Sequence, residues 1–180
     1  MLNILDFGCG PHGVGRMLLR SLKQKDDKLY LFDPHVDIEH PRDANEFIAT
    51  KQDVYGDARL PFDIVNLSHV LCCMEPIDAI YALKNLKASH PKAMLVVVDY
   101  TLRNRSAMEV LKLLTSHEEM KWRRHMGDEA FAHTRRQFTP ESLEHLIRLA
   151  GYLPEEGIRP LDKSGIRAFA VACPDPQQIP

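Results

Sequence analysis

The fold of this chain is decided by the stretch Ile4-Leu5-Asp6-Phe7-Gly8-Cys9-Gly10-Pro11-His12-Gly13-Val14-Gly15. A short apolar run ends in an acid, a glycine-rich turn follows, and an amphipathic segment runs on to Leu22. This order predicts a strand, a tight loop and a helix. Glycine lets the backbone turn sharply and lets a ligand approach closely, and the amide groups at the start of the helix point into the loop. The stretch therefore predicts a nucleotide-type binding loop at the edge of an α/β sheet.

Two ligand classes use such a loop. The spacing Gly8-x-Gly10-x-x-Gly13 fits a dinucleotide, and Asp33 follows about 20 residues later, where an acid that binds ribose belongs. Asp6 points to the other class, because a carboxylate two residues before the first glycine suits a ligand with an ammonium group there. An NAD-binding enzyme remains the alternative.

The string Leu5-Asp6-Phe7-Gly8-Cys9-Gly10 resembles the first motif of class I methyltransferases that use S-adenosylmethionine. A second string, Phe62-Asp63-Ile64-Val65 followed by Ser68 and Val70-Leu71, also resembles this family. The resemblance implies an α/β, doubly wound fold with a mostly parallel seven-stranded sheet and an antiparallel last strand. It also implies S-adenosylmethionine as methyl donor and S-adenosylhomocysteine as product.

The resemblance assigns donor-binding roles along the carboxyl edge of the sheet. Asp33 would hold the ribose hydroxyls, which a carboxylate does well, and Pro34 would lie near adenine. The full donor-binding set is Asp6, Gly8, Cys9, Gly10, His12, Asp33, Pro34, Gln52, Asp53, Leu67, Ser68 and His69. His69 is also a candidate catalytic base.

The third strand has two candidates, residues 47–50 and 54–58. In a sheet ordered 3-2-1-4-5 the chain must then cross to the far side of the first strand, and a parallel crossover needs about a dozen residues. That length favours residues 47–50 and places Lys51, Gln52 and Asp53 at the adenine edge, where Gln52 or Asp53 would accept a hydrogen bond from the adenine amine. Asp57 stays as the rival.

Other elements are expected from apolar runs and caps. Strands are predicted at residues 3–7, 29–32, 62–67 and 94–98, followed by two short ones around residues 157–159 and 167–172. Helices are predicted over residues 13–23 and 77–88. A third helix begins at Thr139-Pro140 and stops at Gly151, with its cap, its first-turn proline and its glycine stop in order.

Composition bounds the classes of function. The chain has 180 residues, 44% of them apolar, with a net charge of −2. These values predict one domain over residues 1–173, a flexible tail at 174–180, and no general attraction to nucleic acid or membranes. No apolar run nears the ~20 residues of a membrane span, and the N-terminus does not read as a signal peptide. Cys9, Cys72, Cys73 and Cys173 are expected as buried thiols in a cytoplasmic protein; no metal site is expected.

The sequence departs from the family pattern at two places. His12 stands where many members have a third glycine. The first strand begins almost at Met1, so the usual N-terminal helical cap over the donor is missing from the sequence. We expect a second subunit or the segment 101–138 to close the pocket, and donor binding that is weak or depends on a partner.

The segment 101–138 is the expected substrate-side insert. Residues 121–136 hold five Lys/Arg and the only tryptophan, Trp122, which suits an anionic or flat substrate; a solvated helix face is the alternative. His117, His125 and His133 are candidate bases, of which His133 joins His69 in the predicted catalytic pair. The predicted activity is methyl transfer to an O, N or C nucleophile of a small molecule, with RNA as the second choice of acceptor and a donor-binding pseudo-enzyme subunit as an alternative.

Overall fold

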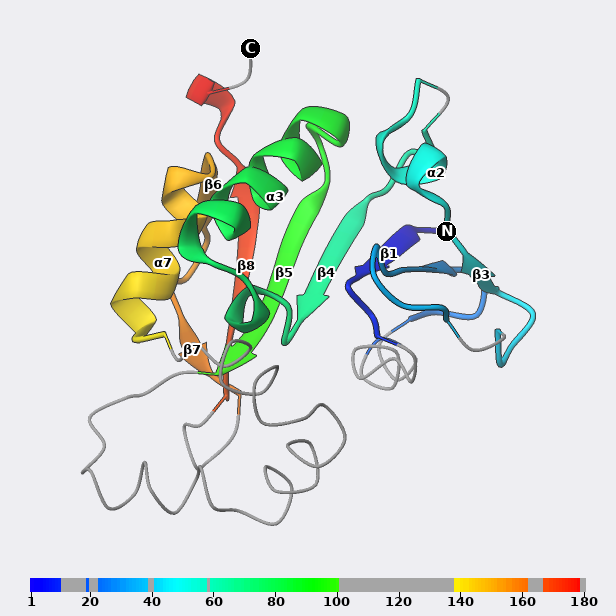
Figure 1. Cartoon of the computed structure of the whole chain (residues 1–180), viewed down its shortest axis with the longest axis horizontal. Helices are drawn as coiled ribbons and strands as arrows, with labels where there is room; N and C mark the ends of the chain where they lie inside the picture. Colours follow the sequence, from blue (N-terminus) through cyan, green and yellow to red (C-terminus); the bar gives the residue numbers. More distant parts are fainter. Residues whose placement is uncertain are drawn as a thin grey trace.

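The computed structural model describes residues 1–10, 19, 23–38, 41–57, 59–100, 138–161 and 167–178. Their centre is one twisted sheet of eight strands (Figure 1). In sheet order these are β3 (Glu46–Ile48), β2 (Lys28–Phe32), β1 (Asn3–Phe7), β4 (Ile64–Ser68), β5 (Met94–Tyr100), β8 (Arg167–Pro174) and β6 (Tyr152–Pro154), while β7 (Arg159–Pro160) also pairs with β8. Strands β1 to β5 are parallel, and β8 runs antiparallel to β5, β6 and β7.

The order of the strands creates a switch point beside β1. The chain passes from β1 outward to β2 and β3, and then returns to pair β4 with the other side of β1. The loops after β1 and β4 therefore leave the sheet in different directions from neighbouring carboxyl ends. In open α/β sheets this crevice is where ligands bind.

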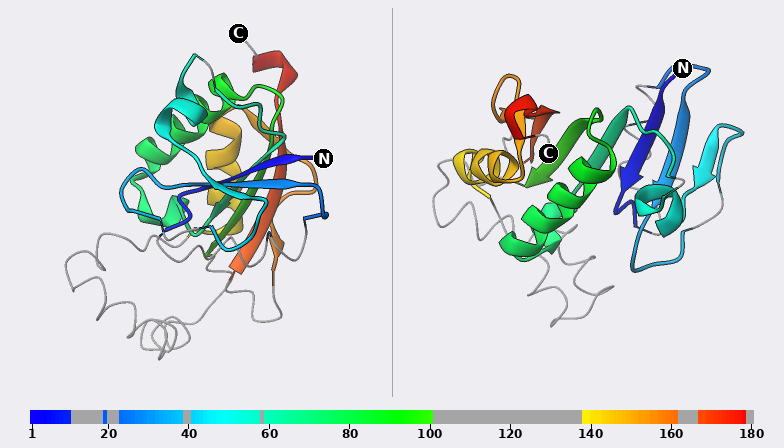
Figure 2. Two further views of the ribbon diagram at one scale, coloured as in Figure 1. Left: turned by 90° about the vertical axis from the view of Figure 1, so that its right-hand side faces the viewer. Right: turned by 90° about the horizontal axis from the view of Figure 1, so that it is seen from above.

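The described helices cover one face of the sheet. Helix α3 (Pro76–Ser89) lies between α2 (Lys51–Tyr55) and α7 (Pro140–Leu149), as the view from above shows (Figure 2). Two 3₁₀ turns, η1 (Leu71–Cys73) and η2 (Pro176–Gln178), follow β4 and β8. None of the described helices is long and apolar enough to cross a membrane.

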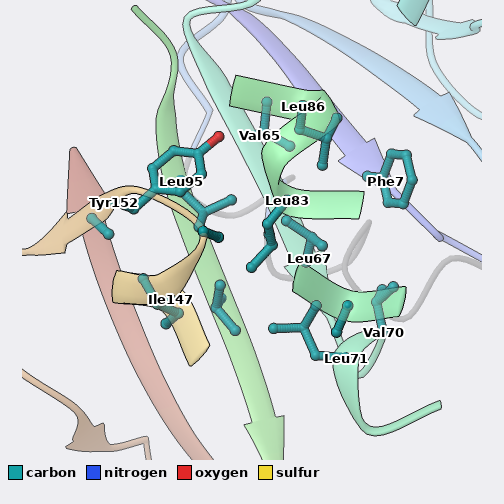
Figure 3. Close-up of a cluster of buried hydrophobic side chains, with 14 of the residues drawn as sticks. Phe7, Val65, Leu67, Val70, Leu71, Leu83, Leu86, Leu95, Ile147 and Tyr152 are labelled. Atoms are coloured by element: carbon teal, nitrogen blue, oxygen red, sulfur yellow. The ribbon is translucent and has the colours of Figure 1, made fainter. Parts of the chain in front are cut away.

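The main core fills the space between the sheet and these helices. Leu67 of β4, Leu95 of β5, Leu83 of α3 and Ile147 of α7 are all fully buried in it (Figure 3). In a smaller cluster, Ile4 of β1 and Leu29 and Leu31 of β2 pack with Cys9 and Leu19. Apolar residues on both faces explain why strands such as β5 read as continuous apolar runs.

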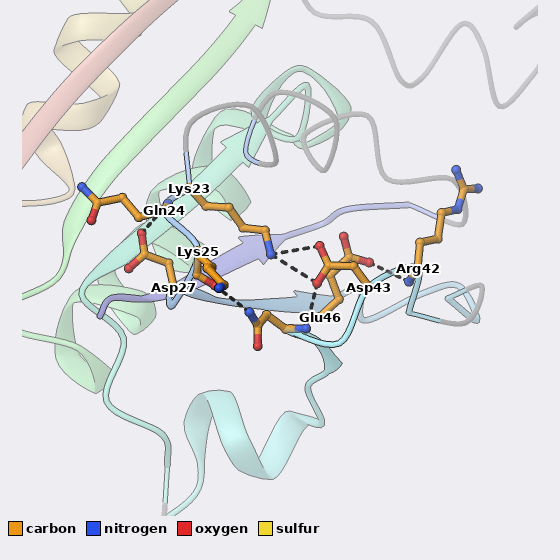
Figure 4. Close-up of polar contacts among 8 residues, drawn as sticks. Lys23, Gln24, Lys25, Asp27, Arg42, Asp43 and Glu46 are labelled. Atoms are coloured by element: carbon orange, nitrogen blue, oxygen red, sulfur yellow. Dashed lines mark hydrogen bonds and ion pairs between the residues drawn. The ribbon is translucent and has the colours of Figure 1, made fainter.

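The amino edge of the sheet is fixed by local polar contacts (Figure 4). The Asp27 carboxylate accepts bonds from the N–H groups of Gln24 (2.9 Å) and Leu2 (2.7 Å), and these bonds lower the pKa of Asp27. Lys23 Nζ lies 3.0 Å from Asp43 Oδ2, which ties the loop before β2 to the loop before β3. These contacts are at the end of the parallel strands that is remote from the switch point, so they support the fold rather than a ligand.

The expected fold class is confirmed, with one correction to the strand count. The sheet has eight strands rather than seven, because Tyr152–Pro154 forms a strand of its own directly after Gly151. A strand of only three residues, the last of them proline, is too short to show an alternation of apolar and polar residues. The last helix keeps its predicted ends: Thr139 caps it through a hydrogen bond from Ser142 N, and Gly151 follows it with φ 86°.

The rival third strand at residues 54–58 is wrong. Lys51–Tyr55 is a helix, capped by the Thr50 hydroxyl, and β3 occupies residues 46–48 as the crossover length required. The expected helix at 13–23 and the insert at 101–138 lie outside the described residues, apart from Leu19, Lys23 and Phe138. The segment expected as a tail includes Pro174 at the end of β8 and the turn η2.

Candidate functional site

The loop after β1 is held from two neighbouring strands. Gly8 and Gly10 have φ values of 68° and 64°, a left-handed conformation that favours glycine. Gly8 N donates to Phe32 O at 2.7 Å, and Gly10 N donates to Asp33 Oδ2 at 2.9 Å, so the end of β2 sets the loop. A Cβ atom on Gly8 would lie 2.8 Å from Val70 Cγ2, so the segment after β4 packs directly on this glycine.

Asp6 lies below this loop, one residue before the end of β1. Its side chain is 1% exposed, and Oδ1 accepts a 2.7 Å hydrogen bond from Asn66 Nδ2. The pairing of β1 with β4 brings the two residues side by side. The same amide nitrogen donates to Ser68 Oγ at 3.1 Å, so the polar chain continues to the carboxyl end of β4.

Asp33 stands at the end of β2 with both carboxylate oxygens in use. Oδ2 accepts from Gly10 N, while Oδ1 accepts from His35 N (2.9 Å) and Val36 N (3.3 Å). The second pair of bonds forms a turn around Pro34. Each carboxylate oxygen has two lone pairs, so Oδ2 keeps capacity for one more donor beside the bond to the loop. Asp33 therefore both shapes the loop and is able to bind a hydroxyl.

A cleft of 860 Å³ is lined by Asp33 and Pro34 and by residues of α2 and α3. Phe7, Phe32 and Tyr55 form an aromatic cluster on its wall, with ring centroids 5.4 to 6.4 Å apart. Burial raises the pKa of Tyr55 to about 12, so its phenol is neutral at all working pH values. The remaining lining groups are Ala49, Thr50, Lys51, Met74, Asp78, Tyr81, Ala82, Asn85, Ala88 and Ser89.

Gln52 and Asp53, predicted beside adenine, do not line this cleft. Asp53 Oδ2 accepts from Thr50 N (2.7 Å) and Thr50 Oγ1 (2.6 Å), and these bonds lower the pKa of Asp53. The carboxylate thus closes a capping box at the start of α2. Lys51, the third residue predicted at the adenine edge, does line the cleft, together with Thr50.

His69 follows β4 at the ligand edge and has φ 60°, the one described non-glycine residue with a positive φ. Strained backbone of this kind is common at functional sites. His69 N donates to Val98 O at 2.7 Å, and its own carbonyl accepts from Cys73 Sγ at 3.4 Å. These bonds fix the peptide on both sides of the histidine. A role for His69 in catalysis stays a prediction.

The other predicted residues are placed as follows. The Leu67 side chain is fully buried in the main core, so only its backbone is able to meet a ligand. Cys9 belongs to the loop after β1 and is buried in the smaller cluster, and its N–H donates to Phe32 O at 3.3 Å. His12 and His133 lie outside the described residues.

The four cysteines differ in burial. Cys9 and Cys72 are buried, whereas Cys73 is exposed and Cys173 is half-buried. Cys72 N donates to the buried Asp99 Oδ2 at 3.1 Å, and contacts with Cys73 together with burial raise the pKa of the Cys72 thiol. Within the described ranges, no group of three or more His, Cys, Asp or Glu is arranged to hold a metal.

Asn66 is the site residue that the sequence analysis missed. It is fully buried, yet it is polar and sits among the apolar residues of β4. A buried amide needs a polar partner, so an asparagine within an apolar strand indicates a buried hydrogen bond that the sequence alone could have suggested. The partner itself is 60 positions away, so only the register of the sheet identifies it.

Comparisons with known proteins bear on the family and the fold. Residues 2–156 match a family model described as a methyltransferase domain. No curated protein sequence matches the chain. Among solved structures, the SAH-bound form of CalO1, a methyltransferase in calicheamicin biosynthesis, shares 19% identity at a TM-score of 0.65, over 97% of this chain and 49% of that chain.

Two further solved structures have similar values. Human N-acetylserotonin methyltransferase in complex with SAM shares 16% identity at a TM-score of 0.64, over 96% of this chain and 47% of that chain. The mitomycin 7-O-methyltransferase MmcR shares 16% identity at a TM-score of 0.63, over 96% and 49%. This chain thus spans about half the length of these structures, and at such identities the likeness shows the fold.

Proposed function

This chain belongs to the methyltransferase-domain family, and we propose that it binds S-adenosylmethionine at the carboxyl ends of β1, β2 and β4 and transfers the methyl group to a small molecule. The observation that carries the proposal is the arrangement of two acids around one glycine loop. Asp6 is buried below the loop, and Asp33 bonds to it from the next strand.

The described residues fit the three parts of this donor. A buried carboxylate attracts an ammonium group, which the methionyl end carries and a pyrophosphate lacks. Asp33 keeps a lone pair for a ribose hydroxyl. The cleft beside it has aromatic walls for a flat base, and Pro34 is among its lining residues. Gly10 leaves open space at the loop, because a Cβ atom there would meet nothing within 4 Å.

The amino group of adenine needs an acceptor in this cleft. Gln52 and Asp53 were predicted for that task, but Asp53 is engaged by Thr50. The cleft offers Asp78 and Asn85 of α3, whereas the Thr50 hydroxyl already donates to Asp53 Oδ2 and accepts from Asp53 N. We assign the amino group to this polar wall.

When bound, the donor supplies a sulfonium-activated methyl group, so the chain's own task is mainly binding and alignment. His69 lies at the correct edge to orient an acceptor or take its proton. His133 stays a second candidate. The acceptor atom (O, N or C), a covering partner subunit and a cytoplasmic location belong to the same proposal.

The proposal is tested by calorimetry and thermal shift with S-adenosylmethionine, S-adenosylhomocysteine and NAD. We expect binding of the first two, because a ligand that binds the folded chain raises its melting temperature. Binding of NAD alone, or of none of the three, would refute it. Conversion of the donor in a mixture of small nucleophiles, followed by mass spectrometry, distinguishes an active enzyme from a donor-binding pseudo-enzyme; RNA added separately tests the other acceptor class.

The role of Asp6 is tested with Asp6→Asn, using the exposed Asp26→Asn as the matched control. Loss of a charged hydrogen-bond partner is worth about 1.5–3 kcal/mol, so S-adenosylhomocysteine should bind about 10- to 100-fold more weakly to Asp6→Asn. The control should bind within about twofold of the wild-type chain. Equal affinity in all three proteins would contradict the assignment of Asp6.

A further inference from the structure

Asn66 is a buried amide whose two nitrogen-bound hydrogens are both used. Its Nδ2 atom lies 2.7 Å from Asp6 Oδ1 and 3.1 Å from Ser68 Oγ. An ionised carboxylate only accepts hydrogen bonds, so the contact with Asp6 fixes which way the amide faces. The reverse orientation would place Asn66 Oδ1 against a carboxylate oxygen, which is repulsive. The Ser68 hydroxyl also lies 3.4 Å from Asn66 Oδ1, to which it is able to donate.

The surroundings of Asn66 make this contact rigid. Asn66 is fully buried, and its neighbours along β4, Val65 and Leu67, belong to the main core. The sheet register sets Asp6 opposite Asn66. A side chain packed on a regular strand holds a neighbour more firmly than one on a loop.

We propose that Asn66 is the positioning residue for the amino-acid end of the methyl donor, because it holds the Asp6 carboxylate in the orientation that receives the donor's ammonium group. This inference rests on the proposed function. Asn66 itself does not touch the ligand; it acts through Asp6, and Ser68 locks its amide from the other side.

The proposal predicts a selective loss of affinity. S-adenosylhomocysteine carries the amino-acid group, whereas 5′-methylthioadenosine has the same adenosine and thioether without it. Replacing Asn66 by leucine should therefore weaken binding of the first ligand about tenfold or more and leave the second within about twofold. A general loss of packing would weaken both.

The experiment measures both ligands by calorimetry on the folded wild-type chain, Asn66→Leu, Ser68→Ala and Asn45→Leu. Asn45 serves as the control because its side-chain amide also donates a hydrogen bond, to Lys25 O at 2.8 Å, but it is half-buried and lies at the remote amino edge. Ser68→Ala removes one of two restraints on the amide and should show a smaller selective loss. If Asn66→Leu does not fold by circular dichroism, Asn66→Ser, whose short hydroxyl cannot reach both acceptors, replaces it.

A second arm asks whether Asn66 acts through Asp6. In the Asp6→Asn background, Asn66→Leu should cause no further selective loss, because coupled residues are not additive. Equal weakening of both ligands, an unchanged affinity for S-adenosylhomocysteine, or full additivity with Asp6→Asn would each overturn the inference while leaving donor binding by the wild-type chain intact. A wild-type chain that binds neither ligand would overturn the proposed function as well.

Discussion

Replacement of Gly8 by alanine tests how the binding loop is fixed. A new Cβ atom would lie 2.8 Å from Val70 Cγ2 and 3.0 Å from Cγ1, and the backbone has φ 68°. Gly10 has almost the same conformation, φ 64°, but a Cβ atom there meets nothing within 4 Å. The two glycines therefore share the backbone strain and differ in the steric contact.

The size of each effect follows from this difference. A left-handed conformation costs an alanine about 1–2 kcal/mol, which the reduced entropy of the unfolded chain offsets by about 0.4–1 kcal/mol. Gly10→Ala should therefore lower the free energy of unfolding by about 1 kcal/mol. Gly8→Ala adds overpacking against Val70, worth about 1–3 kcal/mol, so its total should be about 2–4 kcal/mol.

Urea unfolding followed by circular dichroism measures both values. At this chain length 1 kcal/mol shifts the melting temperature by about 2–4 °C, so thermal melts give an independent reading. The double variant Gly8→Ala/Val70→Ala should recover part of the loss, because the smaller side chain removes the clash. Equal destabilisation by Gly8→Ala and Gly10→Ala, with no coupling to Val70, would refute the view that the segment after β4 holds the loop.

Three further predictions concern stability. Thr50→Ala should cost about 1 kcal/mol by removing the cap of α2, and the urea midpoint of Asp53→Asn should fall in parallel, since both residues form one capping box. His90 is buried, and desolvation is the main cause of its lowered pKa. As the pH falls below about 6.5, His90 is protonated in the unfolded chain before it is protonated in the folded chain, so the free energy of unfolding should decrease from pH 7.5 to 5.5. The decrease should be less steep in His90→Gln, and equal slopes in the two proteins would contradict this. Leu83→Ala in the core should cost about 2–5 kcal/mol in the same assay, against less than about 0.5 kcal/mol for the part-exposed Leu153→Ala.

The sequence predicted well those elements whose signals are local. Helix α7 was found with its cap, its proline and its glycine stop, because each signal lies within a few residues of the helix end. Strand β5 was found because seven residues that are mostly apolar need burial on both sides. Strand β6 was missed because it is defined only by its pairing with β8, which lies about 20 residues later in the sequence.

The site was predicted in part for the same reason. Asp6, Gly8, Gly10 and Asp33 all end predicted strands or lie in the loop after one, and the structure brings them together. Asp53 was given a ligand role although the spacing Thr50-x-x-Asp53 is itself a capping signal.

The contacts of Asn66 with Asp6 and of Val70 with Gly8 both depend on the register between β1 and β4. β1 pairs with β4 so that Asp6 faces Asn66, and the segment that continues from β4 reaches Gly8 with Val70. A slip of one residue would turn Asp6 to the opposite face of the sheet and remove the Asn66 contact at once. Core packing opposes that slip, because Leu5 and Val65 would then leave the main core. The packing that holds the sheet together is thus also what aims the carboxylate.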